Sequence, residues 1–407
     1  MRKTINIGDL GTIITGKTPP TTNKNYYGDY AVFIKPTDIS EHSKYTYETE
    51  EMYSKLAAEK YESSLIPKGA ICVPCIGTIG TKMTMAPCDC YTNQSINSII
   101  CNENYDNEYV YYLIKNFLPG LKAYNLGTAS GREYVSKSNF EKIELVAEQD
   151  KEIQKKIGII LSRYDSLIEN YQKQIKLLEE AAQRLYKEWF IDLHFPGHEN
   201  TNIIDGVPEG WEKKTIDDVT CKITTGLNPR KNFVLGKGSN YYVTIKNMAD
   251  NTLFLDDRCD RVDNEALEKI NKRSDLKIGD ILFSGIGTIG RVALVYIPTN
   301  NWNVSESVFT LRANDIVTKE FLYLMLLSPD MQNYCQSNAH GAAQKGIRMA
   351  DLKAYSFNLP PFGVIQKFTN LVTPTIKKVS SIRNQIRLLT EARDRLLPKL
   401  MSGEIAV

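Results

Sequence analysis

The sequence predicts an α+β protein in which a mixed α/β globular domain occurs twice, each copy followed by a long helix. The two long helices are expected to pack antiparallel as a coiled coil. Three observations predict this: motifs recur about 210 positions apart, short β-rich runs are punctuated by Gly and Pro, and two apolar stripes show heptad spacing. At 407 residues, the chain is long enough for two or three domains.

Internal duplication is the first of these observations. The segment Ile76–Gly80 reads IGTIG and recurs as Ile286–Gly290, and QIKLL at 174–178 recurs as QIRLL at 385–389. A spacing that persists from end to end cannot come from one short motif. The period is far longer than that of a solenoid repeat, so it indicates a duplicated globular module.

Each globular part shows short β-rich runs with helical patches between them. The runs that predict strands are Tyr30–Lys35, Ala70–Ile76, Ile96–Cys101, Tyr241–Lys246 and Asp280–Gly285. The patches that predict helices are Glu108–Phe117 and Glu320–Leu327.

The long helices are predicted from apolar residues spaced three and four apart. The first stripe comprises Ile153, Ile157, Ile160, Tyr164, Leu167, Tyr171, Ile175, Leu178, Ala182, Leu185 and Trp189. The second comprises Phe368, Val372, Val379, Ile382, Ile386, Leu389, Leu396 and Leu400, with breaks at Thr375 and Arg393. A helix with one apolar stripe needs a partner, and the twin helix supplies it.

Proline and glycine predict where these helices stop. Pro374 indicates a start or kink of the second helix, and Pro398 and Gly403 indicate its end. The Pro- and Gly-rich segment after residue 192 indicates a linker. The predicted boundaries are 1–150 and 211–362 for the globular domains, 151–192 and 363–407 for the helices, and 193–210 for the linker.

Composition excludes several classes of protein. With 42% hydrophobic and 24% charged residues, the chain is neither disordered nor a coiled coil alone. The longest apolar run, Phe321–Leu327, is far too short to span a bilayer, and the first ten residues lack the apolar core of a secretory signal. Eight cysteines are too sparse for a disulfide scaffold. A cytoplasmic protein is expected, and its net charge of +2 does not by itself indicate a nucleic-acid binder.

Two glycine- or proline-rich motifs are predicted to be structural. The Gly-Thr-Ile-Gly segments lack the spacing of a phosphate-binding loop, so they predict tight turns with positive φ. Asn358–Phe362 is similar to the Pro-Pro-aromatic loop of amino-methyltransferases, but Leu359 stands directly before the prolines and no glycine-rich cofactor loop follows a strand. A rigid start of the second long helix is the better interpretation.

No metal, cofactor or catalytic site is predicted. The nearest approach to a zinc site is a group of four cysteines, Cys72, Cys75, Cys88 and Cys90. Strand alternation would place Cys72 and Cys75 on opposite faces, which favours buried small hydrophobic residues instead. His194 and His198 are separated by Pro196–Gly197, so no helix presents them together.

The remaining candidates for a functional site are polar loops that occur at matching places in both copies. Lys, Arg, Asn, Gln, Ser, Thr and Tyr side chains are the types that contact phosphates and base edges, although one such loop alone is more typical of ordinary solvated surface. The candidate DNA-binding residues are Lys17, Thr18, Asn23, Lys24, Tyr26, Lys35, Ser130, Arg132, Arg230, Lys231, Lys246, Asn247, Gln344 and Lys345.

The order of domains, together with several motifs, resembles the specificity subunits of type I restriction–modification enzymes. Leu185–Phe190 leading into Phe195–Gly197, followed by Val207–Trp211, is similar to that family's central connector. Leu396–Ile405 is similar to its C-terminal ending. The chain departs from the family pattern where each helix begins: Val146–Gln149 lacks a preceding Pro-Pro, and the residues after Pro361 lack Glu-Gln.

The resemblance implies a function for each part. Each globular part would be a target-recognition domain that reads one half of a split, asymmetric sequence in double-stranded DNA. The helices would act as a spacer, and each would dock one modification (methyltransferase) subunit. Restriction subunits would join for cleavage, while this subunit would catalyse nothing, hold no cofactor and contact no membrane.

Two other classes of protein are weighed against this interpretation. A coiled-coil scaffold without DNA specificity would use the same helices, and salt-dependent DNA binding with a methyltransferase partner would exclude it. A stand-alone methyltransferase is disfavoured by Leu359 and by the missing cofactor loop, and binding of S-adenosylmethionine to the isolated chain would revive it.

Overall fold

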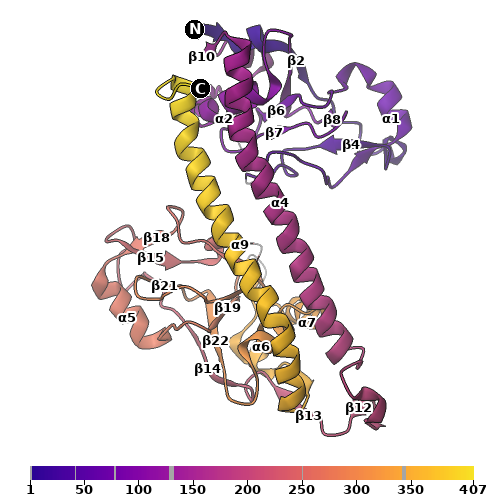
Figure 1. Ribbon diagram of the computed structural model, residues 1–407, viewed down its shortest axis with the longest axis vertical. Coiled ribbons are helices and arrows are strands. Elements are labelled where there is room, and N and C mark those ends of the chain that lie inside the picture. The colour runs from indigo at the N-terminus through magenta and orange to yellow at the C-terminus, as the bar shows by residue number, and fades with distance from the viewer. Residues whose placement is uncertain (1, 42, 78, 128–132, 250, 342–344) are drawn as a thin grey trace. The chain divides into compact units, whose positions relative to one another are not determined.

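The computed structural model describes residues 2–41, 43–77, 79–127, 133–249, 251–341 and 345–407. The chain forms two compact units. Unit 1 combines Met1–Gln172 with Gln385–Val407, and unit 2 is Lys173–Asn384. Each unit therefore contains one globular domain and a part of both long helices, α4 (Lys151–Phe190) and α9 (Phe362–Ser402) (Figure 1).

Unit 1 is built around an antiparallel sheet with the strand order β2-β9-β6-β7. These strands are β2 (Gly11–Thr15), β9 (Ile96–Cys101), β6 (Ile71–Pro74) and β7 (Thr84–Met85). A second sheet has the order β3-β5-β4-β8, with strands β3 (Tyr27–Gly28), β5 (Met52–Tyr53), β4 (Ala31–Ile34) and β8 (Tyr91–Thr92). A further pair joins β1 (Arg2–Asn6) to β10 (Glu144–Glu148). The helices are α1 (Lys55–Lys60), α2 (Asn107–Phe117), α3 (Lys137–Glu141), η1 (Ile7–Leu10), η2 (Lys24–Tyr26), η3 (Glu62–Ser64) and η4 (Leu118–Tyr124).

Unit 2 repeats this topology. Its four-stranded sheet has the order β14-β22-β19-β20, with strands β14 (Thr220–Thr225), β22 (Val308–Ala313), β19 (Ile281–Ser284) and β20 (Val292–Leu294). The smaller sheet β18-β15-β21 consists of β18 (Asp260–Val262), β15 (Asn240–Val243) and β21 (Trp302–Val304). The pair β13 (Glu212–Thr215) and β23 (Ser356–Leu359) corresponds to β1 and β10. The main sheets of the two units share one strand order and pairing. The smaller sheets share a parallel pair, β4 with β8 and β15 with β21, although that sheet has four strands in unit 1 and three in unit 2. The predicted α+β class and its duplication are confirmed.

The remaining elements of unit 2 lie in its linker and connections. They are α5 (Asn264–Ser274), α6 (Lys319–Leu326), α7 (Pro329–Ser337), α8 (Met349–Ala354), η5 (His198–Asn200), η6 (Ile245–Asn247), β11 (Ile203–Ile204), β12 (Val207–Pro208), β16 (Met248–Ala249) and β17 (Thr252–Leu253). Helix α4 ends before His194, so no helix holds His194 and His198 together, as predicted. Their rings lie 5.4 Å apart in the linker.

Side-chain alternation and the glycine turns also follow the predictions. Cys72 packs in one hydrophobic cluster with Ile34, whereas Cys75 packs in another with Tyr109, so the two cysteines lie on opposite faces. Gly77 and Gly287 adopt φ values of 86° and 82°, as expected for tight turns.

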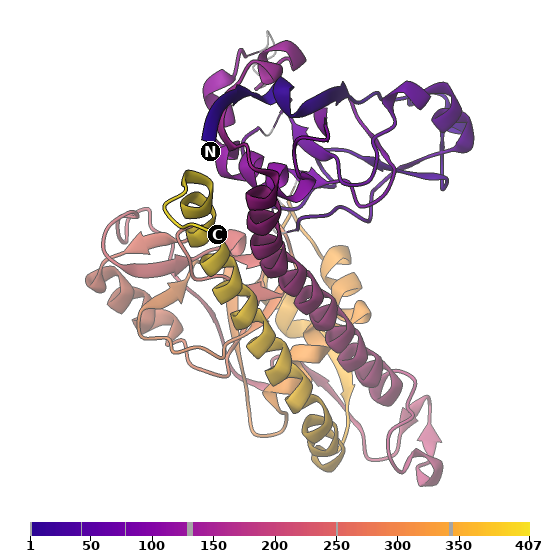
Figure 2. The ribbon, with the colours of Figure 1, turned by 45° about the horizontal axis from the view of Figure 1, so that its top comes forward.

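Within each unit, the parts of α4 and α9 pack antiparallel (Figure 2). In unit 1, Ile157 and Leu161 share a core with Leu397 and Leu400, while residues of α2 fill the same core. In unit 2, an aromatic cluster replaces these aliphatic contacts. The Phe190 ring centroid lies 4.8 Å from that of Phe368 and 5.0 Å from that of Phe321 on α6.

The buried stripe of α4 in unit 1 differs from the predicted one. Leu161 and Ile168 are buried, whereas the predicted seam residue Leu167 is exposed. The buried face also includes two polar residues, Gln154 and Asp165, which a search for apolar spacing passes over. The helix packs on α2 as well as on α9, and Gly158 lies so close to Glu108 that an added Cβ would clash. This second partner moves the buried face around the helix.

Helix α9 neither starts at Pro374 nor stops at Pro398, so these two parts of the predictions were wrong, whereas its end before Gly403 was predicted correctly. The helix begins at Phe362 and runs through both Pro374 and Pro398, and it ends at Ser402, directly before Gly403. Gly403 has a φ of 82°, a conformation that suits glycine after a helix. The Arg2 guanidinium donates hydrogen bonds of 2.9 Å to the carbonyl oxygens of Leu400 and Met401, so the last turn is satisfied by the first strand of the same unit.

A buried ion pair joins the two long helices in unit 1. Arg393, one of the predicted breaks in the apolar stripe, donates to Asp165, which also accepts a 2.6 Å hydrogen bond from the Tyr112 hydroxyl. Burial alone would raise the pKa of Asp165, but nearby Lys115 and Arg393 and the Tyr112 hydrogen bond hold it below its ordinary value. In the second copy, the positions corresponding to Asp165 and Arg393 are the apolar Ile376 and Ala182.

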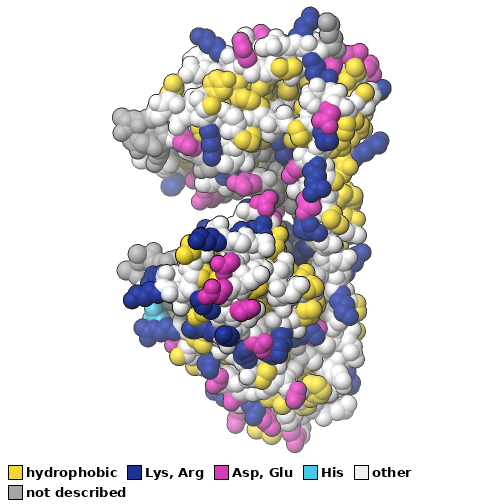
Figure 3. Space-filling view, turned by 90° about the vertical axis from the view of Figure 1, so that its left-hand side faces the viewer, with side chains coloured by type: hydrophobic (Ala, Val, Ile, Leu, Met, Phe, Trp, Pro, Cys, Tyr) yellow, Lys and Arg dark blue, Asp and Glu magenta, His cyan; other side chains and the backbone are white. Residues whose placement is uncertain are grey.

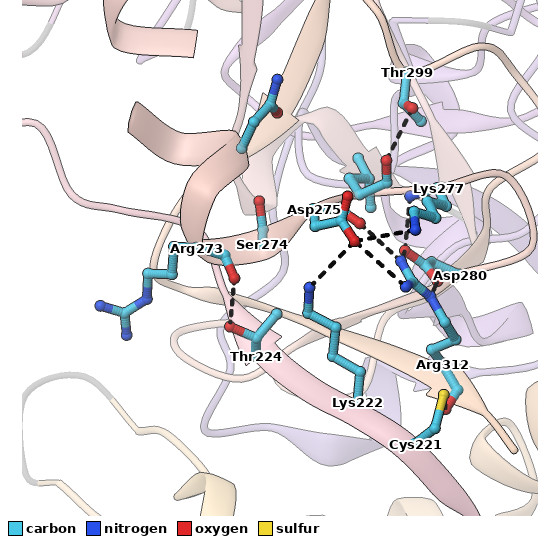
Figure 4. Close-up of polar contacts among 12 residues, drawn as sticks. Cys221, Lys222, Thr224, Arg273, Ser274, Asp275, Lys277, Asp280, Thr299 and Arg312 are labelled. Atoms are coloured by element: carbon cyan, nitrogen blue, oxygen red, sulfur yellow. Dashed lines mark hydrogen bonds and ion pairs between the residues drawn. The ribbon is translucent and has the colours of Figure 1, made fainter. Parts of the chain in front are cut away.

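A second charge cluster secures the sheet of unit 2 (Figure 4). Arg312 on β22 forms two hydrogen bonds of 2.7 and 2.9 Å with the buried carboxylate of Asp280, which precedes β19. Asp275, in a left-handed conformation after α5, receives ion pairs from Lys277, Lys222 and Arg312. The cluster ties the end of α5 to strands β14 and β22, so these cations are engaged in holding the fold.

We predict that Arg393→Ala lowers the free energy of unfolding by about 3 kcal/mol, because it leaves the Asp165 carboxylate buried without its cation. Urea unfolding of the full chain measures this loss. The double change Asp165→Ile with Arg393→Ala installs the residues of the second copy and should recover part of the loss. Arg395→Ala, at an exposed position on the same helix, is the control. An equal loss in the control would contradict the role of the ion pair.

In unit 2, Arg312→Met should cost about 3 kcal/mol, because Asp280 would stay buried without its partner. Lys222→Met removes only a 3.7 Å ion pair to the exposed Asp275 and should cost less than about 1 kcal/mol. Thermal unfolding of the two variants beside the parent chain distinguishes them. Equal melting temperatures for both variants would show that the Asp280 pair does not stabilise the sheet.

Candidate nucleic-acid interface

Several loops of unit 1 lie at one edge of its main sheet because of the directions in which the strands run. Strands β2 and β6 both run antiparallel to β9, so their carboxyl ends lie where β9 begins. The Lys17 amide after β2 donates to the Thr92 carbonyl over 2.9 Å, and the Cys75 amide after β6 donates to the Ser95 carbonyl over 2.7 Å. Residues 16–20, the described part of 75–80, and 92–95 therefore meet.

Two further segments join this group of loops. The amide of Asn93 donates to the carbonyl of Ile34 over 3.1 Å, which places the segment after β4 beside 92–95. The amide of Gly77 donates to the carbonyl of Glu133 over 2.9 Å, which attaches the described part of the 125–134 loop. We call this group of five segments the loop edge of unit 1.

Unit 2 forms an equivalent loop edge. The amide of Gly226 after β14 donates to the carbonyl of Ser305 over 3.3 Å, and the amide of Gly285 after β19 donates to that of Ser307 over 3.0 Å. The Ser305 amide in turn donates to the carbonyl of Val243, where β15 ends, over 2.8 Å. The Gly287 amide donates to the carbonyl of Lys345 over 2.7 Å, which adds the loop before α8. The loop edge of unit 2 thus comprises residues 226–232, 244–247, 285–290, 305–307 and the described part of 340–347.

A glycine and a tyrosine position the first loop of each edge. A Cβ at Gly16 would lie 2.1 Å from the Thr92 carbonyl oxygen, and one at Gly226 would lie 1.6 Å from that of Val304. Only glycine fits, which explains why the Thr-Gly pair recurs. In each unit a tyrosine hydroxyl then donates a 2.6 Å hydrogen bond to the carbonyl of the next residue. The donors are Tyr53 on β5, which binds Lys17, and Tyr242 on β15, which binds Leu227.

The residues predicted in unit 1 fall into two places. Lys17 and Thr18 are exposed on the loop edge. Lys24 and Tyr26 lie instead on η2 beside α1, where the Lys60 ammonium donates a 2.6 Å hydrogen bond to the Tyr26 hydroxyl. The Asn23 side chain accepts from the Asn25 amide and caps η2.

Two predicted residues have partners within the chain. Lys35 forms ion pairs of 2.7 Å with Glu50 and 3.3 Å with Glu51, so two carboxylates balance its charge. Asn247 is 2% exposed, and its side-chain oxygen accepts a 2.9 Å hydrogen bond from the Thr244 amide. DNA contacts by either side chain would compete with these interactions.

The other residues predicted in unit 2 are accessible. Arg230 and Lys231 are exposed on the loop after Gly226, and Lys345 is exposed beside the Gly287 turn. Lys246 is exposed on η6, which the Arg291 guanidinium holds through a 3.0 Å hydrogen bond to the carbonyl of Ile245. Ser130, Arg132 and Gln344 lie outside the described residues.

The sequence analysis missed the segment that precedes the central strand of each sheet. Gln94 before β9 accepts a hydrogen bond from the Thr18 hydroxyl, and Glu306 before β22 accepts one of 3.2 Å from the Tyr242 hydroxyl. Both belong to the loop edges. The repeat contains a signal for them, because Ser95-Ile96 and Ser307-Val308 align about 212 positions apart and bring Gln94 opposite Glu306.

Charge on the surface is mixed. On the face shown in Figure 3, dark blue Lys and Arg side chains are interspersed with magenta Asp and Glu side chains and form no continuous basic area. In the part of the chain that the structure describes, no three His, Cys, Asp or Glu side chains are grouped so that they could hold a metal ion. No helix there has the length and apolar character needed to cross a bilayer.

Known proteins share the sequence pattern and the fold of this chain. The family model for the type I restriction modification DNA specificity domain matches the chain twice, over residues 2–180 and 208–386. These two matches cover most of the sequence and follow the internal repeat.

Individual relatives agree with the family match. The MjaIX specificity subunit of a type I restriction enzyme from Methanocaldococcus jannaschii is 28% identical, over 98% of this chain and 93% of its own. The EcoBI specificity subunit from Escherichia coli is 26% identical, over 77% of this chain and 69% of its own. The crystal structure of the S subunit of a type I restriction–modification system from M. genitalium shares the fold, with a TM-score of 0.57 and 17% identity over 98% of this chain and 96% of that one. The chain therefore belongs to the family defined by the type I restriction modification DNA specificity domain, which it contains in two copies.

Proposed function

We propose that this chain is the non-catalytic DNA-recognition subunit of a type I restriction–modification enzyme and acts in the cytoplasm. Each loop edge reads one half of a split target in double-stranded DNA. The recognition domains are residues 1–150 and 211–362, the spacer helices 151–192 and 363–407, and the linker 193–210. The observation that carries the proposal is the presence of two equivalent loop edges in a chain of this family.

Differences between the two edges support an asymmetric target. The position of Lys17 in unit 1 is occupied by Leu227 in unit 2, and that of Thr18 by Asn228. The backbone positions are equivalent, because Tyr53 and Tyr242 bind the carbonyls of Lys17 and Leu227 in the same way. Equivalent backbones that present different side chains favour different bases.

The long helices are the proposed docking sites for two modification subunits, which restriction subunits then join for cleavage. Both helices keep large apolar side chains exposed after packing within their units, and such side chains commonly mark contacts between proteins. They are Ile159, Leu167 and Leu177 on α4, and Leu371 and Leu388 on α9. Partner subunits would also supply positive charge that a chain with a net charge of only +2 lacks.

Methylation sequencing tests the function directly. A bacterial host without a related system would express this chain together with the modification subunit encoded beside it. We expect a new split motif of methylated bases that is absent when this chain is omitted. Two soluble proteins that associate but leave the genome unmethylated, and fail to bind any DNA sequence selectively, would contradict the proposal and favour the coiled-coil scaffold.

Lys17→Ala and Arg230→Ala should weaken DNA binding by the assembled complex. Each lysine or arginine that neutralises a phosphate contributes about one unit to the dependence of log affinity on log salt, so each change should reduce that slope by about one. Fluorescence anisotropy at several salt concentrations measures the slope. Size-exclusion chromatography shows whether assembly with the modification subunit is preserved, and lost assembly would place these loops at a subunit contact instead.

A further inference from the structure

We propose that Gln94 and Glu306 are specificity-determining residues, one for each half of the target, with Gln94 reading an adenine and Glu306 the amino group of a cytosine. This inference rests on the proposed function, because it names two residues that select bases at the two loop edges.

The two side chains occupy equivalent places. Each comes just before the central strand of its sheet. Directly after Gln94, the carbonyl of Ser95 accepts from the amide of Cys75, the first residue after β6. Directly after Glu306, the carbonyl of Ser307 accepts from the amide of Gly285, the first residue after β19. Asn93 and Ser305, directly before them, donate to the ends of β4 and β15. Backbone hydrogen bonds on both sides therefore hold the turn that carries each side chain in a defined position against its sheet.

Gln94 has the chemistry of an adenine reader. Its side chain is exposed, and its oxygen accepts a hydrogen bond from the Thr18 hydroxyl, which orients the amide. An amide oxygen has a second lone pair, and among the described residues nothing accepts from the amide nitrogen of Gln94. One donor and one acceptor thus remain side by side. In the major groove, adenine presents the complementary N7 acceptor and N6 donor.

Glu306, as a carboxylate, can only accept hydrogen bonds. Its side chain is half-buried, and one carboxylate oxygen shares the single hydroxyl hydrogen of Tyr242, at 3.2 Å, with the Leu227 carbonyl at 2.6 Å. No lysine or arginine within the described ranges forms an ion pair with Glu306. An unbalanced carboxylate is unfavourable near phosphates but accepts well from an exocyclic amino group. The amino group at N4 of cytosine is the donor that Glu and Asp bind in the major groove.

The residues that support Gln94 and Glu306 differ as well. Phe33 occupies the strand position in unit 1 that corresponds to Tyr242, because the next residues, Ile34 and Val243, accept from the residues directly before Gln94 and Glu306. The tyrosine hydroxyl of unit 1 comes instead from Tyr53 on β5, and it binds the Lys17 carbonyl. Thr18 takes over the orienting role there, from the neighbouring loop. Each reader is thus matched to its own hydrogen-bond donor, which is what a side chain held for recognition requires.

The test compares methylation motifs in the co-expression host. Gln94→Ala should relax one base pair in one half of the motif, with discrimination at that base pair falling tenfold or more, and should leave the other half unchanged. Glu306→Gln should change one base pair in the opposite half from cytosine toward adenine, because it exchanges an acceptor-only group for an amide. Gln336→Ala, at an exposed position on α7 outside the long helices and the loop edges, is the matched control and should leave both halves unchanged.

A second variant separates reading from folding. Gln94→Glu keeps the size of the side chain and should replace adenine by cytosine at the same base pair. An unchanged motif in both Gln94 variants, or relaxation of both halves at once, would overturn this inference while the parent chain still directs methylation. Absence of any motif with the parent chain, together with no selective DNA binding by the assembled proteins, would instead overturn the proposed function. Loss of assembly with the modification subunit in both Gln94 variants would show a structural role and would also overturn the inference.

Discussion

The apolar stripes on α4 and α9 must be buried, and their burial sets how each unit is assembled. Neither helix can expose such a stripe to water, and full burial of each large side chain contributes about 1.5–3 kcal/mol. In each unit, part of α4 and part of α9 share a core with one helix of the globular domain, α2 in unit 1 and α6 in unit 2. The packing that buries the stripes therefore also orients the globular domain, and with it the loop edge.

The polar residues in these stripes make the two units unequal. Unit 1 buries Asp165 against Arg393, whereas unit 2 has Ile376 and Ala182 at the corresponding positions. A buried carboxylate is tolerated only opposite a cation, so registers that place Asp165 against an apolar residue are disfavoured. The duplicated helices thus contain information about which segment pairs with which, although their apolar spacing is nearly the same.

The placement of charge explains how a chain with a net charge of +2 can present cationic loops. Several lysines and arginines are neutralised inside the chain, among them Lys35 beside Glu50 and Arg312 beside Asp280. Lys17 and Arg230 lie exposed on the loop edges instead. The sum of charges is therefore a poor guide to function here, because the position of each cation relative to the acids decides what it can bind.

The duplication, the α+β class, the long helices and the glycine turns could all be predicted from the sequence, because each depends on local spacing or on a conformation that one residue type favours. The sequence also placed Lys17 and Arg230 in loops. It could not determine that Leu167 is exposed while Asp165 is buried, since that follows from α2 covering a second face of α4. Nor could it determine that Lys35 is neutralised, that Asn247 caps a turn, or that Gln94 and Glu306 join the loop edges. Apart from the local bond between Thr244 and Asn247, these contacts join residues that are separated in the chain, and they form because the pairing of strands brings the strand ends to one edge.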